Sequence, residues 1–390
     1  MPRSTELLGR LLAGIERELE PAVALRHRLH SRPELAHVEQ QTAETVAREL
    51  PVASSTVAGT GRIARVGPAQ GPAVAVRAEL DGLPIEERTG AEFSATGSTM
   101  HACGHDVHMA ALVALARAAH ALAELLPMGL LAVFQPAEEA YPSGAEQLAG
   151  GELRELEPAA VVAAHVHPEL SWQAVALDPG GVNASSDSAE ITVHGEPSHG
   201  AYPHRGRDPI LAIAQIALAL NAQAARRIDP LHGAVLNVGV LEGGRTENVI
   251  PVRARARVAL RALHPEDRET LRELVAEVAH GIAAAHGCSA TVELTEGEPV
   301  LSNDPAIVAG GRELLADAGL RPAPEWRSCG SDDFAFYGAL APLAMAFVGL
   351  DGADGFSPRP LHHPELLVPD SAVGVVARTL AVLYVAACGV

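Results

Sequence analysis

The sequence predicts an α/β fold in which a mostly parallel sheet is flanked by helices, with a smaller α+β domain inserted into it. Three short and almost continuous apolar runs, at 71–77, 129–134 and 159–164, are typical of strands buried on both faces of a parallel sheet. From about Asp187 the pattern changes, and after Pro299 the first pattern returns. The smaller domain is therefore expected to interrupt the larger one.

The larger domain is expected to comprise residues 1–183 and 298–390. Its ligand site should lie beyond the carboxyl ends of its strands, as is general for open α/β sheets. Apolar periodicity and length predict its remaining elements, which are an amphipathic helix in 1–20, a helix at 106–125, a helix at 306–318, a strand at 342–348 and a helix at 370–387.

The inserted domain is expected at 184–297 and follows the β-α-β-β-α-β order of the ferredoxin-like split motif. Asp208 can cap its first helix, and Pro209 occupies the first helical position, where its missing N–H costs nothing. Alternating arginine and alanine at 253–257 indicates an antiparallel strand with one wet face. The predicted elements are strands at 189–194, 234–241, 252–263 and 290–295 and helices at 209–227 and 265–285.

The composition excludes two classes of partner. The chain has 390 residues, 48% of them hydrophobic, and a formal charge of −19. Nucleic acids and anionic membranes bind clustered positive charge, so neither is expected as a partner. The N-terminus lacks the apolar core of a signal peptide and no segment is long and apolar enough to span a membrane, which predicts a cytoplasmic protein. The 4 cysteines are far apart and are expected to be reduced.

Two pairs of side chains suggest metal chemistry. Cys103 and His105 are separated by one glycine before a predicted helix, and a thiolate with an imidazole suits Zn²⁺, Mn²⁺, Co²⁺ or Ni²⁺. Glu138 and Glu139 follow a buried strand, where one carboxylate can bind metal while the other acts as a general base. Each pair has a plain alternative, a structural cysteine with a helix-capping histidine in one case and a solvated loop in the other.

Two further histidines lie in similar positions. His165 follows an apolar strand and His362 lies in a Pro-rich loop near the C-terminus. Taken singly, the first could be a satisfied core residue and the second an ordinary surface residue. Because all of these donors follow strands or lie in loops that can meet at one sheet edge, their joint occurrence favours a two-metal hydrolase site.

These residues belong to sequence blocks that recur in order along nearly the whole chain. The blocks are 26–35, 77–86, 100–108, 134–139, 165–166, 198–204, 248–251, 333–334 and 361–364. Together they resemble the amidohydrolase branch of the glutamate-carboxypeptidase-like dinuclear metallopeptidases (clan MH), which includes aminoacylases, hippurate hydrolases and auxin-conjugate hydrolases. The most specific block is His-Ala-Cys-Gly-His-Asp at 101–106.

The resemblance implies a zinc-peptidase-like catalytic domain with two divalent metal ions per subunit, of which Zn, Mn, Co and Ni are the candidates. Glu138 is implied to be the general base that takes a proton from a metal-activated water. The implied metal ligands are Cys103, His105, Glu139, His165 and His362.

The resemblance also assigns roles outside the ligand set. His199 is implied to donate a hydrogen bond to the developing oxyanion, and Asn248 to contact the substrate. Asp81 is implied to orient a metal-bound histidine. The inserted domain is expected to form a homodimer, and His199 is expected to reach the metals by hinge closure or from a second subunit.

The implied activity is hydrolysis of the amide bond of a small N-acyl amino acid, which releases a carboxylic acid and a free amino acid. A dipeptidase or a deacetylase of a biosynthetic intermediate is the alternative, and a non-catalytic metal-binding dimeric module is a third. Intact Glu138 disfavours the third. The sequence departs from the family pattern at Glu79, Tyr141, Pro197 and Asp332.

Overall fold

The computed structural model describes residues 2–389 and divides into two compact units. Unit 1 consists of Met1–Gly180, Ser302–Trp326 and Phe336–Val390, and unit 2 of Gly181–Leu301 and Arg327–Ala335. Residues 327–335 thus group with unit 2, although the sequence placed them in the larger domain. The reason is backbone pairing, because the Ser328 N–H donates to Val182 O (2.9 Å) and the Ala184 N–H donates to Ser328 O (3.1 Å).

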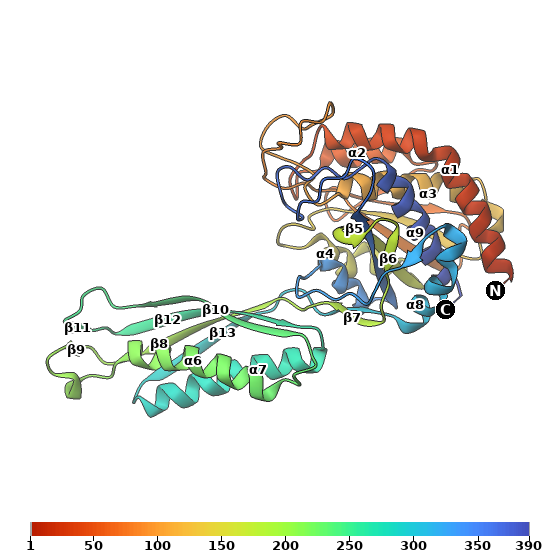
Figure 1. Ribbon diagram of the computed structural model, residues 1–390. Coiled ribbons are helices and arrows are strands. Elements are labelled where there is room, and N and C mark those ends of the chain that lie inside the picture. The colour runs from red at the N-terminus through yellow and green to blue at the C-terminus, as the bar shows by residue number, and fades with distance from the viewer. Residues whose placement is uncertain (1, 390) are drawn as a thin grey trace. The chain divides into compact units, whose positions relative to one another are not determined.

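Unit 1 is built on an eight-stranded sheet in the order β1-β2-β4-β3-β5-β16-β6-β15 (Figure 1). The central strands β4, β3, β5 and β16 are parallel, whereas β1, β2 and β6 run antiparallel to their inner neighbours. The strands are β1 (Ser55–Val57), β2 (Gly61–Val66), β3 (Ala73–Glu79), β4 (Gly129–Gln135), β5 (Ala160–Ser171), β6 (Ala174–Ala176), β15 (Arg321–Pro322) and β16 (Leu343–Asp351). β3 and β4 are buried at every position, which confirms the predicted mostly parallel α/β sheet.

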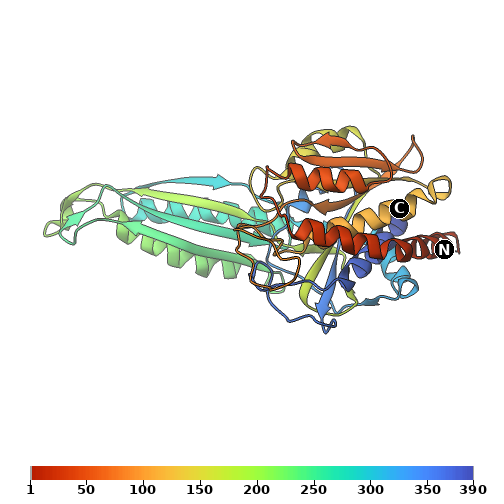
Figure 2. The ribbon, with the colours of Figure 1, turned by 90° about the horizontal axis from the view of Figure 1, so that it is seen from above.

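Helices cover this sheet and complete one large core. α1, α3 and α9 pack on one another, and α3 and α9 also contact the central strands (Figure 2). The helices are α1 (Pro2–His30), α2 (Gln40–Glu49), α3 (His105–His120), α4 (Gly144–Gly150), α5 (Glu152–Glu155), α8 (Pro305–Leu314) and α9 (Ser371–Ala387), with 3₁₀ turns η1 (Ala123–Leu125), η3 (Ala316–Ala318) and η4 (Asp333–Ala339). The first helix is longer than the predicted 1–20, and the predicted 106–125 and 306–318 each end in a separate 3₁₀ turn.

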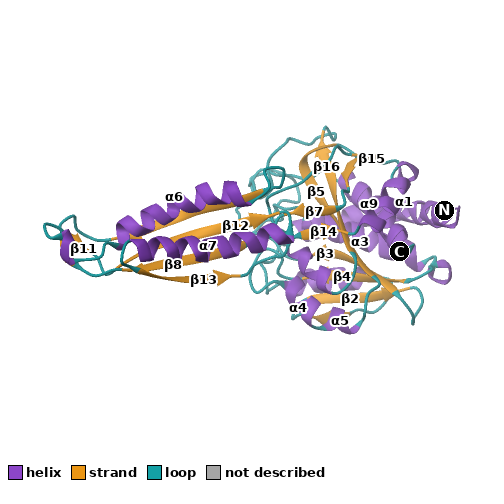
Figure 3. Ribbon diagram, turned by 90° about the horizontal axis from the view of Figure 1, so that it is seen from below, coloured by secondary structure: helices purple, strands orange, loops and turns teal. Residues whose placement is uncertain are grey.

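Unit 2 contains a four-stranded antiparallel sheet in the order β10-β12-β8-β13, with α6 and α7 on one face (Figure 3). Its elements are β8 (Asp187–His194), α6 (Pro209–Arg227), β10 (Ala234–Gly243), β12 (Arg253–Ala262), α7 (Pro265–Ala285) and β13 (Ser289–Thr295). Every second residue of β12 is buried. The Asp208 carboxylate caps α6 by accepting the N–H of Ile210 at 2.8 Å.

Two small strand pairs complete the fold. β9 (Ser198–His199) pairs with β11 (Val249–Ile250), and β7 (Gly180–Asn183) pairs with β14 (Leu301–Asn303). A further 3₁₀ turn, η2 (Pro203–Arg205), follows β9. Among the described residues, no helix has the length and apolar character needed to cross a membrane.

Candidate active site

The carboxyl ends of the parallel strands carry the predicted site in unit 1. β3 ends at Glu79, two residues before Asp81, and β4 ends at Gln135, three residues before Glu138. Between β4 and Glu138 the backbone turns through Ala137, which has a positive φ of 48° although it is not a glycine. Such a conformation is costly for a residue with a side chain and is often found at functional sites. The turn directs the two glutamates out of the strand.

His165 lies inside a strand and not after one. The sequence placed the strand end at Ala164, but β5 continues to Ser171. β5 pairs with β3 only as far as Ala163 and continues along β16, so the strand outlasts its neighbour on one side. This single-sided extension places His165 beyond the last residue pair of β3 and β5, near the other donors.

The structure brings the predicted metal ligands together. Potential ligand atoms of Cys103, His105 and Glu139 lie within 4.8 Å of one another. Cys103 Sγ is 3.4 Å from His165 Nε2. His362 Nε2 is 3.2 Å from Glu139 Oε1, without the alignment of a hydrogen bond. The Cys103–His165 contact is a hydrogen bond, whereas Glu139 Oε1 and His105 Nε2 have no hydrogen-bond partner in the part of the chain that the structure describes. Thiolate, imidazole and carboxylate donors that converge in this way suit a bound cation.

The hydrogen bonds made by Nδ1 of both buried histidines leave Nε2 as the nitrogen that can bind a metal. His105 Nδ1 donates to the backbone carbonyl of Asp81 (2.9 Å), and His165 Nδ1 donates to the carbonyl of Val166 (2.7 Å). In the neutral form of each ring, Nε2 is therefore the nitrogen with the lone pair, and that of His165 faces Cys103 Sγ. His105 Nε2 is buried and has no hydrogen-bond partner among the described residues. A buried polar atom without a partner is costly, and a metal ion would satisfy it.

The charges around His105 favour a cation. Burial opposes the charged ring, but the carboxylates of Glu79, Asp81 and Glu139 outweigh burial and raise the pKa of His105 from 6.5 to about 10. The pKa of His165 is lowered well below 6.5, mainly by burial. The donors present thus fit a divalent ion of the zinc type, which takes imidazole, thiolate and carboxylate ligands.

Glu138 lies at the edge of this cluster. Its Oε2 is 3.8 Å from His105 Nε2, and its side chain retains some exposure to solvent. Asp81 helps to place the glutamate pair, because its carboxylate accepts the N–H of Glu139 at 2.9 Å. Burial raises the pKa of Asp81. Hydrogen bonds from His105 and from the backbone N–H groups of Glu138 and Glu139 outweigh burial and lower this pKa below its usual value.

His362 approaches from a loop that is held by backbone contacts. Its N–H donates to Ala102 O (2.8 Å), and its φ is 65°, again unusual for a residue with a side chain. The side chain is 49% exposed. The loop therefore presents one open donor to the buried ones.

His199 and Asn248 lie in unit 2, where the structure brings them together. His199 is in β9 and pairs with Val249 of β11, and the Gly200 N–H donates to Asn248 O (2.7 Å). The Ala201 N–H donates to His199 Nδ1 (3.1 Å), so Nε2 of the neutral ring carries the proton and can donate to a carbonyl oxygen. Both side chains are exposed.

Two groups of residues near the ligands received no role from the sequence. Glu79 and His108 are buried and form a hydrogen-bonded pair of 2.8 Å beneath the cluster. The only sequence signal was the spacing of His108, three residues after His105 on one helix, which places both on the same face.

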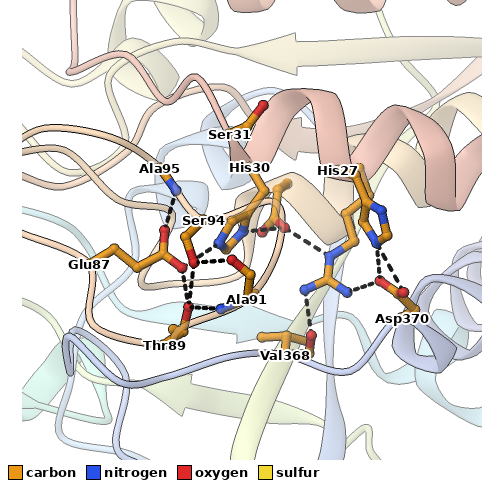
Figure 4. Close-up of polar contacts among 12 residues, drawn as sticks. His27, His30, Ser31, Glu87, Thr89, Ala91, Ser94, Ala95, Val368 and Asp370 are labelled. Atoms are coloured by element: carbon orange, nitrogen blue, oxygen red, sulfur yellow. Dashed lines mark hydrogen bonds and ion pairs between the residues drawn. The ribbon is translucent and has the colours of Figure 1, made fainter.

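The second group surrounds Asp106, the residue after His105. Its carboxylate accepts from Arg26 Nε (2.9 Å) and lies 2.9 Å from His30 Nδ1. Arg26 also donates to Asp370, the residue before α9. His30 Nε2 lies 3.1 Å from Glu87 (Figure 4). This buried network ties the first turn of α3 to α1 and α9.

Known proteins share this organisation over nearly the whole chain. The model of peptidase family M20/M25/M40 matches residues 75–383. N-acetyl-L-cysteine deacetylase of Bacillus subtilis (strain 168) is 34% identical over 371 residues, which cover 93% of this chain and 86% of that protein. N-acetyldiaminopimelate deacetylase of Bacillus licheniformis is 30% identical, with 94% of this chain and 98% of that protein covered. The crystal structure of the Bacillus subtilis YXEP protein, a dinuclear metal binding peptidase from the M20 family, matches with a TM-score of 0.83 at 29% identity, covering 95% of this chain and 98% of that one.

Proposed function

The chain belongs to peptidase family M20/M25/M40 and is an amidohydrolase of that family's amidohydrolase branch, and from this we propose that it removes the acyl group from a small N-acyl amino acid. The observation that carries the proposal is the convergence of Cys103, His105 and Glu139 with Glu138 beside them. An acetyl group is the acyl group we favour, because relatives that match over most of their length are deacetylases of acetylated amino acids.

We propose two divalent ions in the cluster, with zinc, manganese, cobalt or nickel as candidates. When bound, such ions polarise an amide carbonyl and lower the pKa of a water molecule. The cluster would hold them through Cys103, His105, Glu139, His165 and His362. A dinuclear relative of the same fold supports the number of ions.

The remaining steps would be carried out by residues of the protein. Glu138, beside His105 and partly open to solvent, would take the proton of the attacking water and pass it to the departing amine. His199 Nε2–H would donate to the oxygen that becomes negative in the transition state, and Asn248 beside it would contact the substrate. Asp81 would hold His105 in the required tautomer through its carbonyl group.

We propose that the protein acts as a homodimer through unit 2. β10 is an edge strand, and α6 lies beside it. Leu211 and Leu218, seven residues apart on one face of α6, are 59% and 76% exposed, and Leu241 of β10 is 52% exposed. Exposed apolar groups of this kind, next to an open sheet edge, are typical of a protein interface.

A substrate panel tests the activity. The metal-free protein is loaded with Zn²⁺, Mn²⁺ or Co²⁺ and assayed with N-acetyl, N-benzoyl and long-chain N-acyl amino acids and with dipeptides. We expect the N-acetyl amino acids to be hydrolysed with the highest kcat/KM. Glu138→Ala is the matched control, because it should keep its metal content and lose hydrolysis by about 10²–10⁴-fold. Hydrolysis of dipeptides alone would replace the proposal with the dipeptidase alternative.

A further inference from the structure

A buried hydrogen-bonded chain runs from Glu79 to the metal ligand His165. The Val166 N–H donates to His108 Nε2 at 3.1 Å. His108 Nε2 is therefore an acceptor, so Nδ1 carries the proton of the neutral ring and donates to Glu79 Oε2 at 2.8 Å. Each bond in this chain has one possible direction.

Both oxygens of Glu79 are committed within this chain. Oε2 accepts from His108, and Oε1 accepts from the guanidinium of Arg77, which also donates to Gln135 Oε1 at 2.8 Å. Glu79 and His108 lie among potential metal donors, together with His105 and His165. Because their polar atoms already have partners, Glu79 and His108 are unsuited to bind the metal themselves.

The series of hydrogen bonds ends at the backbone N–H of Val166, whose carbonyl group orients His165. The sheet ladder between β3 and β5 stops at Ala163, so β3 no longer supplies an acceptor for the Val166 N–H. His108 Nε2 takes the place of that missing acceptor. The carbonyl of the same Val166 accepts from His165 Nδ1 at 2.7 Å, which sets the ring orientation and directs Nε2 at Cys103 Sγ, 3.4 Å away.

Close packing supports the same arrangement. The rings of His108 and His165 lie 4.7 Å apart, edge to face at 62°. A Cβ at Gly104, the residue directly before α3, would lie 2.5 Å from Val166 Cγ2. The side chain of Val166 is thus packed closely against the turn before α3.

We propose that Glu79 and His108 are positioning residues that act on the metal centre through Val166 and His165. Glu79 fixes the tautomer of His108, His108 anchors the Val166 N–H, and Val166 orients the His165 ring toward the metal. The inference rests on the proposed metal site, and it concerns metal binding rather than the identity of the substrate.

The test is a metal-binding cycle with Co²⁺, measured on metal-free protein by calorimetry and by the visible spectrum of bound Co²⁺. His108→Phe keeps a ring but removes the acceptor. We expect it to weaken the Co²⁺-binding step that His165→Ala also weakens, by about 10–100-fold. His108→Gln, whose amide oxygen can reach the place of Nε2, should recover most of the affinity.

The double variant separates positioning from general destabilisation. If His108 acts through His165, then His108→Phe has no additional effect on Co²⁺ affinity in the His165→Ala background. An unchanged affinity of His108→Phe, or a loss that persists undiminished in that background, overturns the inference.

A second pair of variants keeps the test open if His108→Phe does not fold. Arg77 and His108 bond different oxygens of Glu79, and in Glu79→Gln one of these becomes an NH2 group, which cannot accept. We expect the remaining oxygen to face the cationic Arg77, so that the tautomer of His108 is no longer held and the same Co²⁺ step weakens. Glu79→Asp keeps the carboxylate and should bind within a few-fold of wild type. Equal affinities for the two variants overturn the inference. If the variants show this binding pattern but the wild-type protein hydrolyses no N-acyl amino acid, the proposed function is contradicted and the positioning role stands.

Discussion

Backbone carbonyl groups determine which ring nitrogen of His105 and His165 is available to a metal ion. Each ring donates from Nδ1 to a neighbouring carbonyl, Asp81 in one case and Val166 in the other. Sequence position alone does not select a tautomer, because either nitrogen of an imidazole can carry the proton. The selection therefore belongs to the folded backbone and places both Nε2 atoms at the cluster.

Replacement of Cys103 by serine exchanges one atom, sulfur for oxygen, and tests whether the thiol is a metal ligand. Cys103→Ser should lower metal affinity by more than the roughly 10–100-fold typical of residues that only orient ligands. The reason is that a serine hydroxyl stays protonated under conditions in which a cysteine can bind as a thiolate. Metal content after dialysis, measured by mass spectrometry, gives the result.

The exposed Cys329 supplies the control for this substitution. Cys329→Ser should retain the metal content of wild type. A Cys103→Ser protein with unchanged content would remove the thiol from the ligand set.

At the level of elements, the start of α3 depends on one glycine. Gly104 has a φ of 88°, and a Cβ there would lie 2.5 Å from Val166 Cγ2. Gly71 has nearly the same φ, 87°, but no atom within 4 Å of its ideal Cβ. An alanine at Gly71 would therefore introduce backbone strain alone, whereas an alanine at Gly104 would introduce strain and a steric clash.

We expect Gly71→Ala to cost about 1–2 kcal/mol of unfolding free energy, from backbone strain alone. Gly104→Ala should cost that amount and roughly 1–3 kcal/mol more, because a methyl group is forced against a packed side chain. Urea denaturation of the metal-free variants measures both. Equal losses would show that the contact with Val166 relaxes without cost.

The contact between α1 and α3 predicts a pH dependence. His30 is buried between Asp106 and Glu87 (Figure 4); burial opposes its charge, but the two carboxylates outweigh burial and raise its pKa from 6.5 to about 9. Between these values the folded protein holds a proton that the unfolded chain has lost. The contribution of His30 is therefore complete below about pH 6.5 and disappears as pH rises through 9, a change of roughly 3 kcal/mol.

Comparison with His30→Gln isolates this contribution. The difference in unfolding free energy between wild type and His30→Gln should shrink steadily from pH 6.5 to 9. Denaturant titrations at several pH values measure it. A difference that stays constant over this range would contradict the assignment of the charge to His30.

For the whole molecule, the metal ligands lie in unit 1 and His199 lies in unit 2. The proposed dimer offers a way to test whether one chain completes the site of another. His199→Ala and Glu138→Ala are each expected to be inactive as homodimers. If the site is completed across the dimer, mixing and subunit exchange should create one working site per heterodimer and recover activity.

The interface itself is tested by Leu218→Glu, which places a charge on the exposed apolar face of α6. Light scattering after size-exclusion chromatography should show a smaller species than wild type. If that monomer retains full activity, completion of the site across the dimer is excluded, and recovery by mixing must be absent.

Several strands and helices could be predicted from the local sequence pattern. The apolar runs at 71–77 and 129–134 predicted β3 and β4, and the bounds of α6 and α7 agree with the predicted 209–227 and 265–285. β2 (Gly61–Val66) was missed because it carries two arginines in six residues and lacks an apolar run. Local pattern therefore identified central strands and helices that begin with proline, but not the antiparallel edge of the sheet.

The sequence by itself determined the α/β class, because buried strands and amphipathic helices leave a local periodicity. Its ordered sequence blocks determined the amidohydrolase class through their resemblance to a known family, and the same resemblance predicts the metal ligands. The tertiary structure alone decided how Glu79, His108 and Val166 join into one chain behind His165, since these residues come from β3, α3 and β5. It also decided that β5 continues past His165, because strand length depends on which neighbour still offers pairing. Hydrogen bonds between distant segments form only once the sheet has aligned them, and no local pattern encodes their direction.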